Sequence, residues 1–505
     1  MIQSGAQRQP IEILLSPGDF VRGSLEGEKL TLWLVNGSGA PVRRLAAGVG
    51  SQQPFMFVAG DEGPYRLEVG GSASTGYTLR TEAVVSLANQ VAPETPLASP
   101  LLRRLQQTLA DGGDTAAFWQ RMQQQGTPLV EMEDVLPALG DHEALVTFLW
   151  RGAKRNVRLF GAPSGDHDEL HRLGESDVWY RSYRVPKSAR IAYRVAPDVP
   201  HLNTTARQQR RAILATLQRD PLNPHYEPTA PVDAYEGFSV VALPEADAPL
   251  GLQPNPKHPS GVVETFSLTS EILGNTRDIH IARSPGYVPG AEGNALAVIF
   301  DGERYLDEVK VATILDHLVA EKKIPPIAAV LVGNPSPSSR SAELPCNEHF
   351  AAFIADELMP WIRRRGLNTR RERTIVAGAS YGGLAAAFLG FKHPEIFGNV
   401  FSQSGSFWWS PGGFQADRTE ETQWLTRQFV AAPPQPVRYY LQAGTFEQPS
   451  EILQTTRHLR DCLRAKGYAV EYQEFVGGHG YFYWRHRFAD GIVGLLGEPT
   501  KTTSD

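Results

Sequence analysis

The segment "RTIVAGASYGGLAAAFLGFKHPEIF", residues 373–397, decides the fold of the C-terminal half of the chain. An apolar run, a glycine-rich turn and an Ala-rich stretch predict a strand, a sharp turn and a helix. Residues 378–382, "GASYG", fit the pattern G-x-S-x-G. The glycines of such a turn avoid collisions with neighbouring backbone, and the turn lifts the serine hydroxyl above the sheet. We therefore interpret Ser380 as a nucleophile, with a purely structural turn as the alternative.

Further strand candidates surround this segment. They are "ALAVIFDG" (295–302), "IAAVLVGN" (327–334) and "VRYYLQAG" (437–444), and helical segments alternate with them. Continuous apolar strands that alternate with helices are typical of a largely parallel sheet with both faces covered. We therefore predict an α/β-hydrolase domain over residues 263–498.

A neutral serine is a poor nucleophile and needs a base, which in this fold follows it in the chain. His479 in "VEYQEFVGGHGYFYW" (470–484) follows a predicted strand and two glycines. His458 lies in a helical run with a solvated face, and His486 lies near the start of the last predicted helix. The loop position favours His479 as the base.

The third catalytic group should orient the imidazole from a loop after the preceding strand. Glu447 comes just after the turn at Gly444 and is the favoured acid. Glu451 is the competitor, although it reads as the first turn of a helix, where a carboxylate is stabilised by the helix dipole. Asp461 lies too deep in that helix, and a serine–histidine pair with a weak or absent acid is a further alternative.

An oxyanion hole needs two backbone donors. The amide of Tyr381 is the first candidate because it follows the nucleophile directly. The amide of Glu303 is the second, because "FDGERY" (300–305) follows an earlier central strand. Asp301 in this segment is equally compatible with an ordinary Asp-Gly turn.

The N-terminal half has a different pattern. Residues 1–90 read as short strands separated by Gly, Asn and Asp, which predicts a β-sandwich similar to the jelly-roll modules appended to secreted peptidases. A helical linker is predicted over 91–127, a second β-sandwich over 128–245 and a proline-rich linker over 246–262. The chain is thus predicted to be multidomain, with two N-terminal β-sandwich domains followed by the α/β-hydrolase domain.

Composition excludes several classes of function. The net charge of -6 predicts no nucleic-acid partner and no binding to an anionic membrane surface. Two cysteines and no clustered Cys/His pattern predict no disulfide framework and no metal site. No apolar run is long enough for membrane insertion. The first twenty residues lack signal-peptide character, which predicts a cytoplasmic protein, with the periplasm as the alternative if a signal peptide has been removed.

Several motifs together resemble the enterochelin (ferric enterobactin) esterases. They are "GASYGGLAAAFLGFKHPEIFGNVFSQSGSFWW" (378–409), "RSAELPCNEHF" (340–350), "GGHGYFYWR" (477–485) and "FDGERY", with "VTFLWRG" (146–152), "DVWYRSYRVP" (177–186) and "DPLNPH" (220–225) further upstream. The resemblance covers about three-quarters of the chain, from residue 128 to the end. Gly480 departs from the family, whose members often carry an acidic residue there, and residues 1–90 lie outside its usual architecture.

The resemblance implies a serine esterase acting on the trilactone of a ferric catecholate siderophore, with no cofactor and with iron as cargo. Such a substrate is trianionic and aromatic, so a basic and aromatic site is expected. Arg340 and Arg485 are the predicted cations, with an intraprotein ion pair as the alternative for each. Trp409 and Trp484 are predicted apolar walls, with core packing as the alternative for the tryptophans of "SGSFWW".

Two other functions remain open, because a fold does not determine a substrate. One is a carbohydrate or feruloyl-type esterase, or an acyltransferase, on the same fold. The other is a siderophore-binding protein without catalysis.

Overall fold

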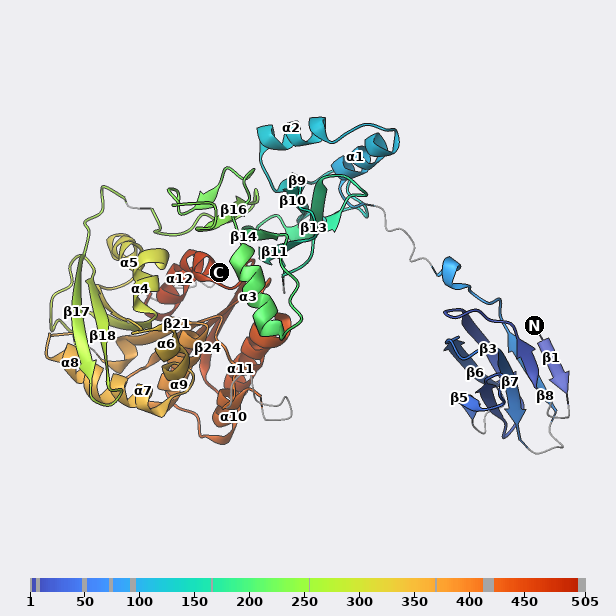
Figure 1. Ribbon diagram of the computed structural model, residues 1–505. Coiled ribbons are helices and arrows are strands. Elements are labelled where there is room, and N and C mark those ends of the chain that lie inside the picture. The colour runs from blue at the N-terminus through green and yellow to red at the C-terminus, as the bar shows by residue number, and fades with distance from the viewer. Residues whose placement is uncertain are drawn as a thin grey trace, which may run out of the picture. The chain divides into compact units, whose positions relative to one another are not determined.

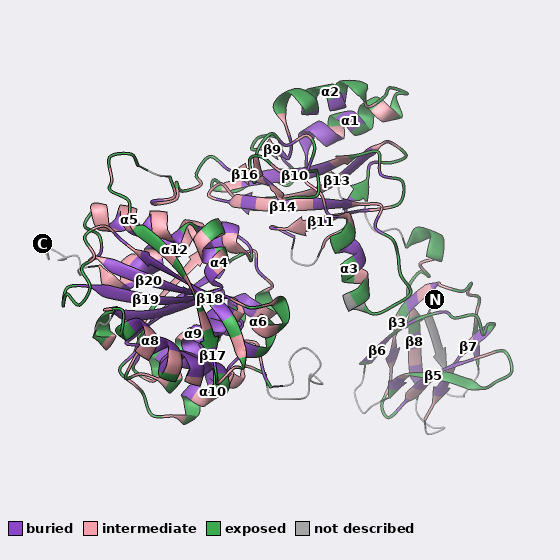
Figure 2. Cartoon of the chain, turned by 60° about the vertical axis from the view of Figure 1, so that its left-hand side comes forward, coloured by how far each residue is buried: buried purple, intermediate pink, exposed green. Residues whose placement is uncertain are grey.

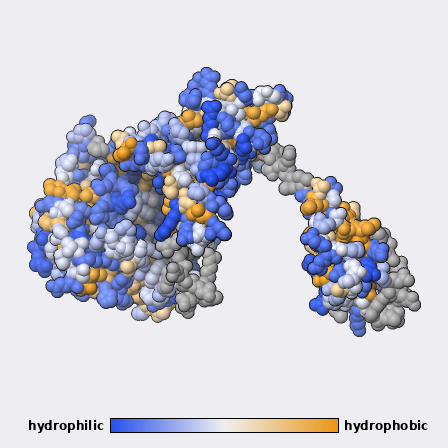
Figure 3. Space-filling view, in the orientation of Figure 1, coloured by the Kyte–Doolittle hydropathy of each residue, from blue (hydrophilic) through white to orange (hydrophobic). Residues whose placement is uncertain are grey.

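A computed structural model of the chain describes residues 2–5, 10–47, 52–71, 76–90, 97–164, 167–253, 255–367, 370–411 and 422–497. The chain forms two compact units, Met1–Pro96 and Leu97–Asp505 (Figure 1). Hydrophilic residues cover much of the face of each unit seen in Figure 3. None of the helices in the described ranges is long and apolar enough to cross a membrane.

The first unit is a β-sandwich of two four-stranded sheets, in the orders β1-β8-β3-β6 and β2-β7-β4-β5. The strands are β1 (Ile2–Gly5), β2 (Ile11–Ile13), β3 (Phe20–Glu26), β4 (Thr31–Val35), β5 (Pro41–Ala47), β6 (Gln52–Val58), β7 (Tyr65–Gly70) and β8 (Tyr77–Thr81). Strict alternation along β6 sends Phe55 and Phe57 into the core and leaves Met56 and Val58 exposed. The unit therefore has a hydrophobic core of its own.

The second unit begins with another β-sandwich, whose sheets have the orders β12-β13-β10-β9 and β11-β14-β16-β15. The strands are β9 (Leu129–Glu131), β10 (Glu143–Arg151), β11 (Val157–Gly161), β12 (His171–Arg172), β13 (Val178–Pro186), β14 (Arg190–Pro197), β15 (Tyr226–Glu227) and β16 (Phe238–Ala242). Helix α3 (Ala206–Thr216) packs against the end of β14. The two predicted N-terminal sandwiches are thus present.

Two helices lie in the region predicted as a linker, and residues 91–96 of that region lie outside the described residues. Helices α1 (Pro100–Ala110) and α2 (Ala116–Gln125) pack on the second sandwich over β9 and β10 (Figure 1). Leu102 and Trp119 are almost fully buried there, against Leu149 of β10. The helices therefore belong to the same packed unit as the second sandwich.

The rest of the chain forms an eight-stranded sheet in the order β17-β18-β20-β19-β21-β22-β23-β24. The first two strands are antiparallel and the remaining neighbours are parallel, from β20 to β24. The strands are β17 (Val262–Ser270), β18 (Asn275–Arg283), β19 (Ala295–Phe300), β20 (Ile327–Val332), β21 (Thr374–Ala379), β22 (Asn399–Gln403), β23 (Arg438–Gly444) and β24 (Ala469–Phe475). This is the α/β-hydrolase architecture that the sequence predicts.

Helices cover both faces of this sheet, so the strands are buried between two layers (Figure 2). The helices are α4 (Gly302–Arg304), α5 (Val311–Ala320), α6 (Pro337–Glu343), α7 (Glu348–Ala352), α8 (Met359–Arg363), α9 (Tyr381–Lys392), α10 (Trp424–Ala431), α11 (Gln454–Ala465) and α12 (Tyr481–Leu496). Along β19, Val298 packs into the core under α9 and Ile299 into the core under α5 and α12. The core that contains Ile299 continues into the second β-sandwich, and this shared core joins the two parts of the second unit.

The beginning of α12 makes the joint with the sandwich. The backbone amide of Ala192 in β14 donates a hydrogen bond to Tyr483 Oη at 2.8 Å, and this hydroxyl donates to the carbonyl of Ala192 at 3.2 Å. The rings of Phe238 and Phe482 meet edge to face at 5.3 Å. The outer face of the second sheet of the sandwich therefore lies against the loop and helix that follow β24.

Candidate active site

Ser380 occupies a strained turn between β21 and α9. Its backbone angles are φ 56° and ψ −120°, a sparsely populated conformation for a residue with a side chain. The amide of Ser380 donates to the carbonyl of Gln403, and its carbonyl accepts from the amides of Leu384 and Ser406, all at 3.0 Å. A Cβ at Gly378 would lie 2.5 Å from the carbonyl carbon of Gly382, so the motif glycine is needed for this close approach.

Glu447 and His479 come together at the same edge of the sheet, after β23 and β24. Their side chains pair through Oε1 of Glu447 and Nδ1 of His479 at 3.3 Å. The carboxylate is buried, whereas 40% of the His479 side chain is exposed. Because Nδ1 faces the carboxylate, Nε2 remains for another partner, which is the orientation that a serine–histidine–acid site needs.

The carboxylate of Glu447 has no hydrogen-bond donor in the described part of the chain. A buried carboxylate is costly unless it is paired, so His479 is the group placed to compensate its charge. Glu447 can therefore both orient the imidazole and stabilise its protonated form. Glu451 lies one turn on, in the π-helical segment η6 (Pro449–Leu453), and Asp461 pairs with Arg460 on α11.

Two serines that sequence reasoning did not single out lie beside these groups. The hydroxyl of Ser380 lies 3.3 Å from that of Ser406 and makes no hydrogen bond to His479 within the described residues. Ser404 accepts a hydrogen bond at 2.9 Å from the indole of Trp484, and this indole meets the His479 ring edge to face at 4.9 Å. The signal in the sequence was the repeated serine of "SQSGS" (402–406), which spans the end of β22 and the turn after it.

The two predicted oxyanion donors lie at helix starts. Tyr381 is the first residue of α9, and Glu303 lies in the short helix α4 after β19. Amides in the first turn of a helix have no acceptor within the helix, so they can bind a developing negative charge. A Cβ at Gly382 would lie 3.4 Å from the Asp301 carboxylate, so the start of α9 and the end of β19 are close neighbours.

Arg340 forms an ion pair with the buried Asp301. Its Nε and Nη2 donate to the two carboxylate oxygens at 2.6 and 2.8 Å. Burial lowers the pKa of Arg340, but the hydrogen bonds and charge of Asp301 outweigh it, so that the pKa is raised overall. The guanidinium lies 5.9 Å from the ring centre of Tyr381, and 27% of the side chain is exposed. Asp301 therefore has two roles: its backbone has the left-handed conformation of a turn, and its side chain pairs with Arg340.

Arg485, the other predicted substrate cation, forms an ion pair with Glu227 of β15 in the sandwich. Its guanidinium also lies over the ring of Phe482 at 4.9 Å. Only 16% of the side chain is exposed. Arg485 therefore ties α12 to the sandwich.

The two predicted tryptophan walls have different surroundings. Trp409 is half-buried and packs edge to face on Trp424 at 6.1 Å. Trp484 is almost fully buried and supports the His479 ring, so its position is that of a core residue. Tyr481 lies next to Trp484, and burial together with the Asp301 charge raises the pKa of its hydroxyl.

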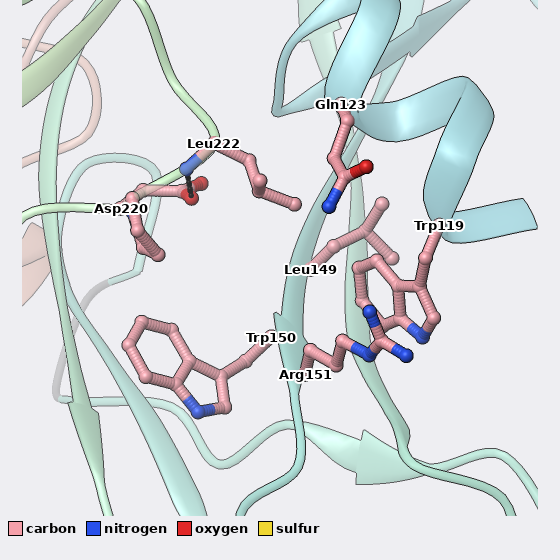
Figure 4. Close-up of a pocket in the computed structure, with 8 residues that line it drawn as sticks. Trp119, Gln123, Leu149, Trp150, Arg151, Asp220 and Leu222 are labelled. Carbon is pink, nitrogen blue, oxygen red and sulfur yellow. Dashed lines mark hydrogen bonds between the residues drawn. The ribbon is translucent and has the colours of Figure 1, made fainter. Parts of the chain in front are cut away.

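A cavity of about 150 Å³ lies away from these residues, between α2, β10 and the turn after Arg219 (Figure 4). It is lined by Trp119, Gln123, Leu149, Trp150, Arg151, Asp220, Pro221 and Leu222. The Asp220 carboxylate accepts from the amide of Leu222, as Figure 4 shows. None of the predicted catalytic residues lines this cavity.

Known families match the two parts of the second unit in order. Residues 145–251 match the family described as "Enterochelin esterase, N-terminal", and residues 270–495 match the family described as "Putative esterase". The first match covers most of the second sandwich, and the second covers most of the α/β-hydrolase domain.

Relatives of known function and known structure agree with these matches. The iron(III) enterobactin esterase of Dickeya dadantii is 28% identical over 75% of this chain and 92% of its own length. The iron(III) salmochelin esterase of Escherichia coli is 29% identical over 75% and 93%. The crystal structure of the ferric enterobactin esterase from Salmonella typhimurium superposes with a TM-score of 0.61 at 26% identity, over 75% of this chain and 98% of that one. With both family segments present in order on a shared architecture, the second unit is a distant relative of the enterochelin esterases over both of its parts.

Proposed function

We propose that this protein is a serine esterase that hydrolyses the trilactone ester bonds of a ferric catecholate siderophore such as ferric enterobactin, and so releases the iron. The observation that carries the proposal is the pairing of Glu447 with Nδ1 of His479, at the sheet edge where Ser380 occupies its strained turn. The relatives named as iron(III) enterobactin and salmochelin esterases support this choice of substrate.

In the proposed reaction, Oγ of Ser380 attacks the ester carbonyl carbon while Nε2 of His479 accepts the hydroxyl proton. The amides of Tyr381 and Glu303 donate to the oxyanion of the tetrahedral intermediate. The imidazolium then protonates the departing alkoxide, and Glu447 stabilises the imidazolium meanwhile. Water then gives a proton to His479 while its oxygen attacks the acyl carbon. The bond from that carbon to Oγ of Ser380 breaks, and the imidazolium returns the proton to Oγ. Iron takes part only as a component of the substrate.

The hydrogen bond between Ser380 and His479 is expected to form on substrate binding. Catalytic hydrogen bonds are often long in free enzymes and shorten in the complex. The Ser380 hydroxyl must then turn from Ser406 towards His479. Arg340 and Trp409 are proposed substrate contacts, because both keep part of their surface exposed on segments that adjoin the turn.

The test is mass spectrometry of the products formed from ferric and iron-free enterobactin. We expect ring-opened linear esters and the free monomeric hydroxy acid from the wild-type enzyme, and turnover reduced by roughly 10³- to 10⁶-fold in Ser380→Ala and His479→Ala. Covalent labelling by a fluorophosphonate should occur in the wild type and be lost in Ser380→Ala. Cleavage of feruloyl or acetyl sugar esters with intact trilactone would overturn the substrate assignment. A chain that binds the siderophore without labelling or turnover would overturn the enzyme assignment.

A further inference from the structure

A charge problem follows from the ion pairs of the two predicted substrate arginines. Under the proposed function, the ferric substrate is trianionic, because Fe(III) offsets only half of the negative charge of its three catecholate groups. Asp301 already compensates the charge of Arg340, and Glu227 compensates that of Arg485. The substrate therefore needs a further cation, one without a carboxylate partner, beside the sheet edge at which Ser380, Glu447 and His479 lie.

We propose that Arg194 of β14 is this cation and binds an iron-bound catecholate group of the substrate. This inference rests on the proposed function and extends it, because it assigns part of the substrate site to the β-sandwich.

The orientation of Arg194 follows from the alternation of side chains along β14. Ile191 and Tyr193 are buried in the core of the sandwich. Successive side chains of a strand point to opposite faces, so Ala192 and Arg194 lie on the other face. Ala192 lies directly opposite Val240 of β16, so Phe238, two residues before Val240, is on this same face. Phe238 packs edge to face on Phe482 of α12, so this face lies towards the α/β-hydrolase domain.

The direction of β14 brings Arg194 towards the catalytic histidine. Arg190, at the beginning of the strand, interacts electrostatically with Arg485 and Arg487 of α12. Ala192 contacts Tyr483, which comes earlier in that helix. The strand thus runs back along α12, and Arg194 lies about 7 Å beyond Ala192 in the direction of His479.

The neighbouring strand gives the same position independently. Phe160 of β11 is the direct partner of Arg194 across the sheet. Just after β11, Cβ of Ala162 lies 3.1 Å from where a Cβ of Gly478 would be, next to His479. Arg194 therefore lies only one strand away from the loop that carries His479, and its side chain is within reach of a ligand bound at that loop.

The surroundings of Arg194 fit an anionic aromatic ligand. Its guanidinium lies 5.1 Å from the ring centre of Phe160, and no carboxylate pairs with it in the described ranges. Arg194 is half-buried, and this burial lowers its pKa. A partly desolvated cation is costly until an anion compensates it. A planar guanidinium can donate several hydrogen bonds to catecholate oxygens and stack on their rings.

The experiment compares Arg194→Met with Arg104→Met, which removes the same charge from the exposed surface of α1. Each is assayed on ferric enterobactin and on iron-free enterobactin, whose catechol hydroxyls are protonated near neutral pH. For Arg194→Met we expect KM for the ferric complex to rise about ten- to a hundredfold with kcat nearly unchanged. KM for the iron-free substrate should stay at the wild-type value, Arg194→Lys should recover part of the loss, and Arg104→Met should match the wild type on both substrates.

Binding of ferric enterobactin to Ser380→Ala, followed by tryptophan fluorescence, gives a second measurement that does not depend on turnover. We expect the added Arg194→Met change to weaken this binding by a similar factor. Unchanged binding, or an equal rise in KM for both substrates, would overturn the role of Arg194. A wild-type enzyme that leaves both trilactones intact would instead overturn the proposed function, and the binding measurement would still decide the role of Arg194.

Discussion

Glu447 is the residue at which the assignment of the acid can be tested most directly. Its buried carboxylate has the His479 imidazole as its charge partner. We expect Glu447→Ala to lower kcat by about 10²- to 10⁴-fold, less than Ser380→Ala, because the nucleophile and base remain. Glu451→Ala is the matched control and should stay near the wild-type kcat on a small neutral ester. A larger loss in Glu451→Ala than in Glu447→Ala would contradict this assignment.

At the residue scale, the sequence predicted which residues lie directly after a strand, because strands and the turns that follow them have recognisable local patterns. Ser380, Glu447 and His479 each follow a recognisable strand, so their common edge followed from the parallel sheet. Their chemical roles stay proposals until the variants are measured. The partners of Arg340 and Arg485 depend on tertiary packing between segments distant in sequence, so the sequence left an ion pair open as an alternative without naming Asp301 or Glu227.

At the element scale, α12 carries a histidine that titrates far from its usual range. Burial lowers the pKa of His486 to about 3, although its Nδ1 donates to the carbonyl of Phe482. The unfolded chain therefore binds the proton more tightly than the folded chain. The stabilisation is complete above the unfolded pKa of about 6.5 and is lost as the pH falls towards about 3.

We therefore expect His486 to lower the free energy of unfolding by about 2 kcal/mol between pH 7 and pH 5. Urea unfolding of the wild type and of His486→Asn at both pH values measures this. The amide of the variant can still donate to the Phe482 carbonyl but does not titrate, so its decline should be smaller by that amount. Parallel declines in the two proteins would show that His486 is exposed or protonated in the folded state.

Element types were predicted well where their periodicity is strong. The continuous apolar runs at β19, β20, β21 and β23 are strands buried on both faces, as predicted. The spacing of Leu, Phe and Trp over 99–126 predicted helices, and α1 and α2 are present. Their packing on β10 could not be predicted, because an amphipathic stripe shows that a helix is covered but not by which element.

At the scale of the whole molecule, the division after Pro96 separates two units with their own cores. We expect a chain of residues 97–505 to fold and to keep kcat/KM within about twofold of the full chain, because units with separate cores can fold alone. Calorimetry should show one thermal transition fewer than the full chain. Loss of activity or of cooperative unfolding in the shortened chain would show that the first sandwich contributes to the site or to its stability.

The order of the domains along the chain was also predictable, because the pattern of apolar residues changes from one typical of short strands to one typical of strands separated by helices. Two sandwiches followed by an α/β-hydrolase sheet are what the structure contains. The docking of the second sandwich on α12 through Ala192 and Tyr483 was not predictable, because the two residues are 291 positions apart in the sequence.

That docking has an evolutionary consequence. The predicted catalytic residues lie in the α/β-hydrolase domain, whereas β14, which flanks them, lies in the second sandwich and is encoded in a different part of the gene. Under the proposed function and the proposed role of Arg194, substitutions along β11 and β14 can change which substrate is accepted while the catalytic groups stay constant. Divergence of preference among descendants of one ancestor would then concentrate in the sandwich and leave the hydrolase sheet nearly unaltered.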